Sequence, residues 1–81
     1  MSPVTNTEIY AVIGKICTQL NVNTLTPEQN LRGYGYDSMD MMNILLELED
    51  RYTLTISDFD AVELVNINAI VAYLNKRKGT Q

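Results

Sequence analysis

The chain of 81 residues is acidic, with a formal net charge of −4, and its length predicts one domain over residues 1–81. Hydrophobic residues make up 46% of it, which argues against disorder. Its longest apolar run, AIVAYL at residues 69–74, is far shorter than the ~18 residues of a membrane span, and the N-terminus lacks the pattern of a signal peptide, so we expect a cytoplasmic protein without a membrane segment. With one cysteine and no histidine, the chain cannot form an internal disulfide, a Ser-His-Asp or Cys-His nucleophile, or the common zinc sites.

The first predicted helix covers about residues 5–20. Its apolar residues recur at the spacing of one helix face: Ile9, Val12, Ile13, Ile16, Cys17 and Leu20. Thr5 lies three residues before Glu8, which is the pattern of a capping box at a helix start. Because Cys17 belongs to the apolar face, we expect it to be a buried core residue.

A long loop is predicted between the first and second helices, over residues 21–36. The segment is rich in asparagine and threonine and contains Pro27 and two glycines, which are typical of turns. It is longer than most loops in compact domains, so we expect it to be held by packing or used for function. Leu25 and Leu31 are the residues that we expect to hold it against the core.

The second predicted helix covers residues 38–52 and carries two apolar rows. One row would face the core: Met41, Ile44, Leu45, Leu48 and Tyr52. The other row consists of Met39, Met42 and Leu46, and a bundle of this size has little room to bury it. Acidic residues lie around these rows, namely Asp40, Glu47, Glu49 and Asp50. The second row is therefore either a surface for binding partners, which exposed methionines suit well, or a face that the long loop covers.

The last third of the chain predicts a connector and two further helices. YTLTI at residues 52–56 alternates like a strand, but a strand without a partner is unstable, so we interpret it as a connector. A short helix is predicted at residues 57–62, capped by Ser57 or Asp58, and a last helix at residues 66–77. The expected fold is all-α, a small four-helix bundle with three longer helices and one short one.

Ser38 stands at the expected start of the second helix, in the stretch GYGYDS. Ser38 and Asp37 are both residue types favoured as N-caps. A helix start also offers free amide groups and a partial positive charge, so it tolerates an attached phosphate. The stretch lacks the lysine of a P-loop and the ligand spacing of an EF-hand, so we predict neither a nucleotide site nor a metal site. Without an adjacent base the serine is a poor nucleophile, which argues against an enzyme.

The acidic residues are concentrated before the end of the chain. Residues 1–75 contain ten acidic residues against three basic ones, and the other three basic residues cluster at 76–78. Such a surface repels phosphate backbones, so nucleic-acid binding is not expected. It favours the approach of basic protein partners.

The stretch LRGYGYDSMDMMNILLELEDRY resembles the signature of acyl carrier proteins and their peptidyl and aminoacyl carrier relatives. In that family a Gly-x-Asp-Ser-Leu/Met motif opens the second helix, and Gly35, Asp37, Ser38 and Met39 match it in order. Leu31 matches the apolar residue before the motif, and NINAIVAYL resembles the family's last helix. The resemblance extends over roughly residues 25 to 75.

This resemblance implies a monomeric, non-catalytic carrier. Ser38 would bear a 4′-phosphopantetheine arm that a separate phosphopantetheinyl transferase attaches. The arm's thiol would hold an acyl or aminoacyl group as a thioester and carry it between a loading enzyme and synthase or tailoring enzymes. The implied partner surface consists of Asp37, Met39, Asp40, Met42, Leu46, Glu49 and Asp50.

Four residues depart from the pattern of the housekeeping fatty-acid carrier. Asn43 replaces a common glutamate, Arg51 interrupts the acidic run, and Tyr34 and Tyr36 replace smaller apolar residues. These departures favour a stand-alone carrier of a specialised polyketide, hybrid nonribosomal or aminoacyl pathway. The alternative is an unmodified, acidic helical module that binds proteins through its second helix.

Overall fold

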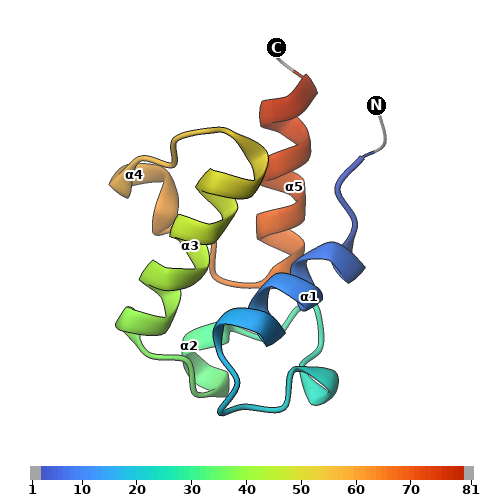
Figure 1. The fold of residues 1–81 in the computed structure, drawn as a ribbon, viewed down its shortest axis with the longest axis vertical. Helices are drawn as coiled ribbons and strands as arrows, with labels where there is room; N and C mark the ends of the chain where they lie inside the picture. The colour runs from blue at the N-terminus through green and yellow to red at the C-terminus, as the bar shows by residue number, and fades with distance from the viewer. Residues whose placement is uncertain (1–2, 80–81) are drawn as a thin grey trace.

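The computed structural model describes residues 3–79, which contain five α-helices and one 3₁₀ helix (Figure 1). In chain order they are α1 (Asn6–Ile16), the 3₁₀ helix η1 (Val22–Thr24), α2 (Leu31–Tyr34), α3 (Ser38–Tyr52), α4 (Asp58–Ala61) and α5 (Ile67–Gly79). Within this range there is no β-strand, so the predicted all-α class and its three longer helices are confirmed. None of the helices described is both long enough and apolar enough to cross a membrane.

The predicted helix boundaries need correction at several points. The first helix ends at Ile16 rather than Leu20, because Cys17 leaves the helix with an extended backbone, at φ −119° and ψ 90°. The predicted long loop contains η1 and α2, which adds a short helix to the four that were expected. The second helix starts and ends as predicted. The short helix occupies 58–61 rather than 57–62, and the last helix runs over 67–79 rather than 66–77.

Side chains near the helix starts explain where the helices begin. The Thr5 side chain accepts a hydrogen bond from the Glu8 amide, and the Ser57 side chain accepts one from the Asp60 amide. Asn66 does the same for the Ala69 amide at 2.7 Å, just before α5. Each of these bonds gives a partner to an amide of the first helical turn, which has no acceptor within the helix itself.

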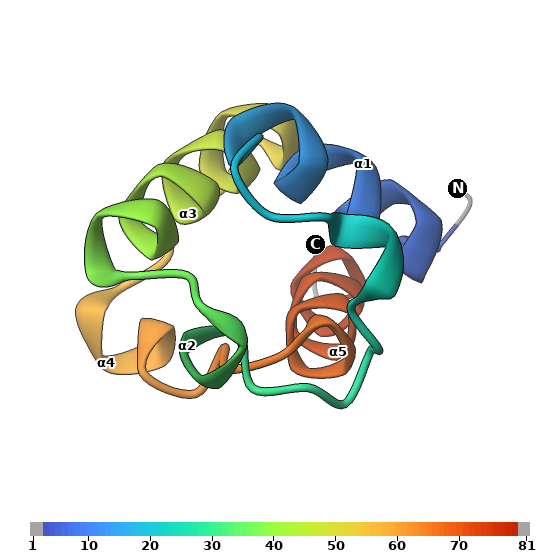
Figure 2. The same cartoon turned by 90° about the horizontal axis from the view of Figure 1, so that it is seen from below.

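The core lies between the three longer helices, which surround it when the molecule is seen from below (Figure 2). The helix α1 contacts both α3 and α5. Leu25 and Leu31 are 3% and 0% exposed, which confirms that both hold the connecting segment against the core. The buried core residues are Val4, Ile9, Val12, Ile13, Cys17, Leu25, Leu31, Tyr36, Ile44, Leu48, Ile56, Leu64, Ile67, Ile70 and Leu74.

Hydrogen bonds join segments that are far apart in the sequence. The Asn75 side chain binds both backbone groups of Val4, accepting at 2.7 Å and donating at 3.0 Å. The Tyr52 hydroxyl donates to Glu8 at 2.7 Å and thereby links α3 to α1. The Leu31 amide donates to the Val65 carbonyl at 2.8 Å, so the start of α2 is fixed to the segment before α5.

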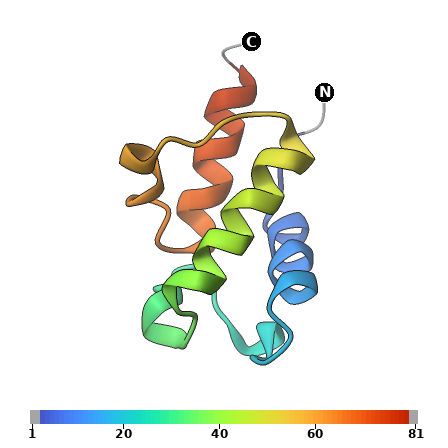
Figure 3. The same ribbon diagram turned by 60° about the vertical axis from the view of Figure 1, so that its left-hand side comes forward.

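The helix α3 has one side toward α1 and another toward α4, as the rotated view shows (Figure 3). The start of α3 lies at the lower end of the bundle, whereas both ends of the described chain lie at the upper end (Figure 1). The N-terminus of α3 is thus placed far from either end of the described chain.

Candidate functional site

A reciprocal capping box fixes the start of α3. The Asp37 carboxylate accepts a hydrogen bond from the Asp40 amide at 2.8 Å, and the Asp40 carboxylate accepts one from the Asp37 amide at 3.1 Å. Of the two candidates for the N-cap, the structure therefore selects Asp37. Ser38 is the first helical residue, it is exposed, and its hydroxyl makes no hydrogen bond to any residue in 3–79. The hydroxyl is consequently free to be modified without a loss of capping.

The turn before Ser38 depends on Gly35. This residue ends α2 with a φ of 135°, a conformation that side-chain-bearing residues rarely adopt. A Cβ atom there would also lie 3.2 Å from Cδ1 of Leu20. The glycine therefore permits both the sharp change of direction from α2 to α3 and close packing against Leu20.

Tyr36 lies directly beneath this turn and is 1% exposed. Its hydroxyl has no hydrogen-bond partner in the part of the chain that the structure describes, and burial raises its pKa. Its ring stacks on Tyr34 with the ring centroids 5.9 Å apart. The Tyr34 hydroxyl donates to the Asn21 carbonyl at 2.8 Å. The two tyrosines thus fill the space behind the capping box and fasten it to the connecting segment.

Tyr36→Phe is expected to raise the free energy of unfolding by about 1 kcal/mol, because it removes a buried hydroxyl that lacks a partner and keeps the ring contacts. Urea denaturation of both proteins measures the difference. Tyr34→Phe is the matched control, since it removes a bonded hydroxyl, and it is expected to lower the free energy by ~0.5 kcal/mol. A loss of stability in Tyr36→Phe would contradict the interpretation of its hydroxyl as unpaired.

Cys17 lies near the same capping box and is 4% exposed, which confirms it as a core residue. Burial, together with the nearby Asp40 carboxylate, raises the pKa of its thiol from 9.0 to about 11. The thiol therefore stays protonated at neutral pH, and a protonated thiol is a poor nucleophile.

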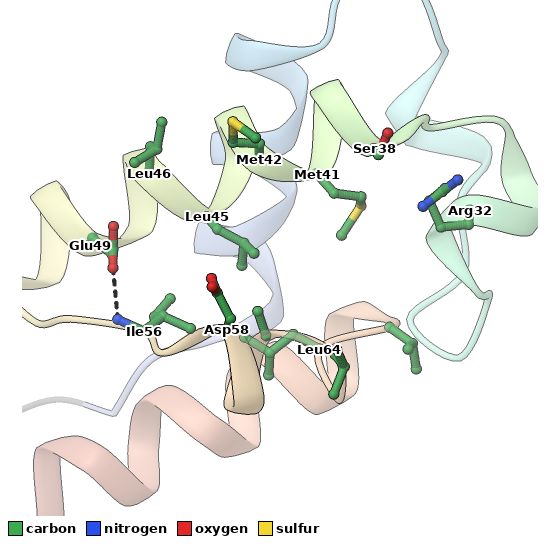
Figure 4. A pocket seen from close by; sticks show the side chains of 13 residues that line it. Arg32, Ser38, Met41, Met42, Leu45, Leu46, Glu49, Ile56, Asp58 and Leu64 are labelled. Carbon is green, nitrogen blue, oxygen red and sulfur yellow. Dashed lines mark hydrogen bonds between the residues drawn. The ribbon is translucent and has the colours of Figure 1, made fainter.

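A pocket of about 400 Å³ extends from Ser38 along α3 (Figure 4). From Ser38 to Glu49 it follows twelve residues of α3, and the eleven helical steps between them span roughly 16 Å. Residues of α4 and its flanking segments form the opposite wall. An exposed hydroxyl at one end of an apolar pocket suits a long attached group that can fold back onto the protein. The lining is mostly apolar and comprises Arg32, Ser38, Met41, Met42, Leu45, Leu46, Glu49, Ile56, Asp58, Ala61, Val62, Leu64 and Val65.

The second apolar row of α3 is exposed, so the connecting segment does not cover it. Met39, Met42 and Leu46 are 64%, 57% and 55% exposed. In the core-facing row, Ile44 and Leu48 are fully buried, and Met41, Leu45 and Tyr52 are half-buried against the core. Of the exposed row, Met42 and Leu46 also line the pocket beside Ser38.

The acidic residues of the expected partner surface differ in their surroundings. Asp37 and Asp40 bind each other's amides in the capping box. Glu49 is half-buried, and its carboxylate accepts a hydrogen bond from the Ile56 amide at 2.7 Å, which fastens the segment between α3 and α4. Asp50 is exposed. The four carboxylates therefore do not form one cluster. Within residues 3–79, no group of three or more acidic or cysteine side chains is placed to hold a metal ion.

The pocket's second wall was not predicted from the sequence. Val62 and Val65, which are 74% and 42% exposed, line it from the end of α4 and the following segment. Phe59 on α4 is 84% exposed as well. A helix of four residues shows no periodic pattern, so only the unusual density of apolar residues near α4 could have drawn attention to it.

Comparison with known proteins agrees with this geometry. A family model described as "Phosphopantetheine attachment site" matches residues 11–74. The chain is 34% identical over 74 residues to the acyl carrier protein of Helicobacter pylori, covering 88% of this chain and 91% of that protein. It is 35% identical over 78 residues to the meromycolate extension acyl carrier protein of Mycobacterium tuberculosis, covering 91% of this chain and 68% of that protein. Its fold is similar to that of a free-standing peptidyl carrier protein from an Acinetobacter baumannii secondary metabolic pathway, with a TM-score of 0.77, 25% identity and 90% of each chain covered.

Proposed function

The chain belongs to the acyl carrier protein family, whose members are non-catalytic carriers with a covalent 4′-phosphopantetheine, and we propose that a separate phosphopantetheinyl transferase attaches this arm to Ser38. The observation that carries the proposal is the exposed Ser38 hydroxyl, which lies at the end of an apolar pocket and makes no hydrogen bond within residues 3–79. Among residues 3–79 the one other serine is Ser57, whose side chain is already bonded to the Asp60 amide.

The start of α3 fits a phosphate on Ser38. The amides of the first helical turn and the helix dipole give this end a partial positive charge. The nearby Asp37 and Asp40 carboxylates oppose the phosphate, but each also accepts a hydrogen bond from a backbone amide in the capping box. The capping box holds the hydroxyl at the protein surface, where a transferase can reach it.

The pocket gives the arm a place to rest. When attached, the arm supplies a terminal thiol that carries an acyl or aminoacyl group as a thioester. The pocket's apolar side chains, such as Leu45, Ile56 and Val65, would contact the uncharged parts of the arm and its cargo and exclude water from them.

The exposed row of α3 is the proposed partner surface. Met39, Met42 and Leu46 offer adaptable apolar contacts to a loading enzyme and to synthase or tailoring enzymes. Such small, charge-steered interfaces form and dissociate quickly, as a shuttle requires. The carboxylates that would attract basic surfaces on those partners belong to Asp37, Asp40, Glu49 and Asp50.

Within the family we propose a monomeric, cytoplasmic, stand-alone carrier of a specialised polyketide or nonribosomal-type pathway. Support comes from Tyr34 and Tyr36, which replace smaller residues before the motif, and from Asn43 and Arg51 on α3. The similarity to a free-standing peptidyl carrier protein is consistent with this assignment.

Intact mass measurement after co-expression with a broad-specificity phosphopantetheinyl transferase tests the attachment. The protein is expected to gain the mass of one phosphopantetheine group. If it gains none with any competent transferase, the unmodified interaction module becomes the better description. If the arm is attached, loading its thiol with candidate acyl or aminoacyl groups, using neighbouring pathway enzymes, would identify the cargo class.

Met42→Glu is expected to lower the kcat/KM of partner enzymes acting on the modified carrier by about tenfold or more, because it places a charge in an apolar contact. The free energy of unfolding should change by less than about 0.5 kcal/mol, since Met42 is 57% exposed. Ala72→Glu, which adds the same charge at an exposed position of α5, is the matched control. A large stability loss in Met42→Glu would instead mean that Met42 supports the core.

A further inference from the structure

Arg32 lies on α2, the short helix that precedes the Ser38 turn, and lines the same pocket as Ser38. The close view places the two side chains at the same end of this pocket (Figure 4). Arg32 is exposed, and its guanidinium group makes no hydrogen bond or ion pair with any residue in 3–79. Within the described part of the chain, a cation therefore stands beside the proposed attachment point without a protein partner.

The other basic residues of the first 75 positions are paired. Lys15 and Arg51 both contact the Glu47 carboxylate, at 3.9 Å and 3.6 Å. The carboxylates next to Ser38 belong to Asp37 and Asp40, which bind each other's amides instead of Arg32. Residues 1–75 contain ten acidic and three basic residues. Of the three basic ones, Arg32 is the residue whose charge is not paired with a carboxylate among the described residues.

The backbone of Arg32 is held firmly on both sides. Leu31 is fully buried, and its amide donates to the Val65 carbonyl at 2.8 Å. The Asn30 side chain caps α2 by accepting a hydrogen bond from the Gly33 amide at 3.0 Å. This anchoring fixes the base of the Arg32 side chain while its guanidinium group remains exposed to the pocket.

We propose that Arg32 binds the phosphate of the arm on Ser38 and so directs the arm from its first atoms toward the pocket. This inference rests on the proposed attachment at Ser38. A guanidinium group can donate two parallel hydrogen bonds to phosphate oxygens, and it also offsets the repulsion that Asp37 and Asp40 exert on the phosphate. Arg32 is a positioning residue in this scheme, because it contacts the arm near Ser38 and not the thiol end.

The experiment compares each protein with and without its arm. The variants are Arg32→Gln, Arg32→Lys and, as the matched control for charge, Arg51→Gln. Intact mass first establishes that the arm is attached. The melting temperatures of both forms of each variant are then measured at low salt and in 1 M NaCl, together with the ³¹P NMR spectrum of the modified form. Comparing two forms of the same variant cancels any effect of the substitution on the fold itself.

Attachment of the arm is expected to lower the melting temperature by about 2–5 °C more in Arg32→Gln than in the wild type or Arg51→Gln. The difference should shrink in 1 M NaCl, where the screening length is only ~3 Å. The ³¹P resonance should shift in Arg32→Gln and not in Arg51→Gln. In Arg32→Lys, the effect of attachment on the melting temperature should return most of the way to the wild-type value, because lysine keeps the charge. The ³¹P resonance should return only part of the way, because lysine loses the paired donors.

Equal changes in Arg32→Gln and Arg51→Gln, with the arm attached in both, would overturn the role of Arg32 and leave the attachment at Ser38 intact. A wild-type protein that gains no arm would overturn both proposals. The mass and melting measurements therefore separate the two failures.

Discussion

Ser38→Ala is expected to abolish attachment of phosphopantetheine completely while changing the free energy of unfolding by less than about 0.5 kcal/mol. The hydroxyl is exposed and makes no hydrogen bond within 3–79, and the N-cap of α3 is Asp37. Alanine is also well accepted in a helix, so the fold should be unaffected. Intact mass after co-expression with a transferase and urea denaturation measure the two effects.

Ser57→Ala is the matched control for this substitution. Its hydroxyl caps α4 by accepting a hydrogen bond from the Asp60 amide at 3.0 Å. The variant should be modified fully but lose about 1 kcal/mol of stability, the usual effect of removing an N-cap. The two serines are thus expected to show opposite outcomes, since Ser38 is needed for modification and Ser57 for stability. Phosphopantetheine on Ser38→Ala would place the attachment elsewhere.

Leu48→Ala is expected to lower the free energy of unfolding by about 2–5 kcal/mol and the melting temperature by more than about 10 °C. Leu48 is fully buried among core residues of all three longer helices, so its truncation leaves a cavity. Domains of this size have only about 5–10 kcal/mol of stability in total, and the variant would lose a large share of it. Chemical and thermal denaturation measure the change.

Leu46→Ala removes the same atoms two residues earlier on the same helix. Leu46 is 55% exposed, so the expected stability loss is less than about 1 kcal/mol. The proposed effect of this variant is instead a slower reaction with partner enzymes. Similar stability losses in the two leucine variants would contradict the separation of α3 into a core row and a partner row.

The longer helices were predictable because their apolar residues repeat over several turns. The start and end of α3 match the prediction. The sequence left open whether its outer row is exposed or covered by the connecting segment, and the structure shows that it is exposed. The predicted end of α1 was wrong for a physical reason. Leu20 continues the helical spacing and is half-buried, but it packs against Gly35 from the turn that follows the helix. The spacing of apolar residues therefore does not distinguish a residue in the last turn of a helix from one in the turn that follows the helix.

The short helix α2 was not predicted, and α4 was predicted one residue too long at each end, because contacts distant in sequence hold both helices. The start of α2 is fixed by the bond from the Leu31 amide to the Val65 carbonyl, and α4 is linked to α5 by the bond from the Tyr73 hydroxyl to the Asp60 carboxylate, at 2.8 Å. The same limit applies to the site. The sequence motif identified Ser38, but the pocket beside it and the position of Arg32 arise from how separate segments pack.

The arrangement of the chain ends has a practical consequence for handling the protein. Both ends of the described chain lie at the upper end of the bundle, and α3 begins at the lower end (Figure 1). An affinity tag, a solid support or a fused fluorescent protein joined to either end would leave Ser38 facing outward into solution. The geometry therefore suits surface-immobilised assays, in which candidate enzymes flow past a tethered carrier and their contacts are recorded one at a time.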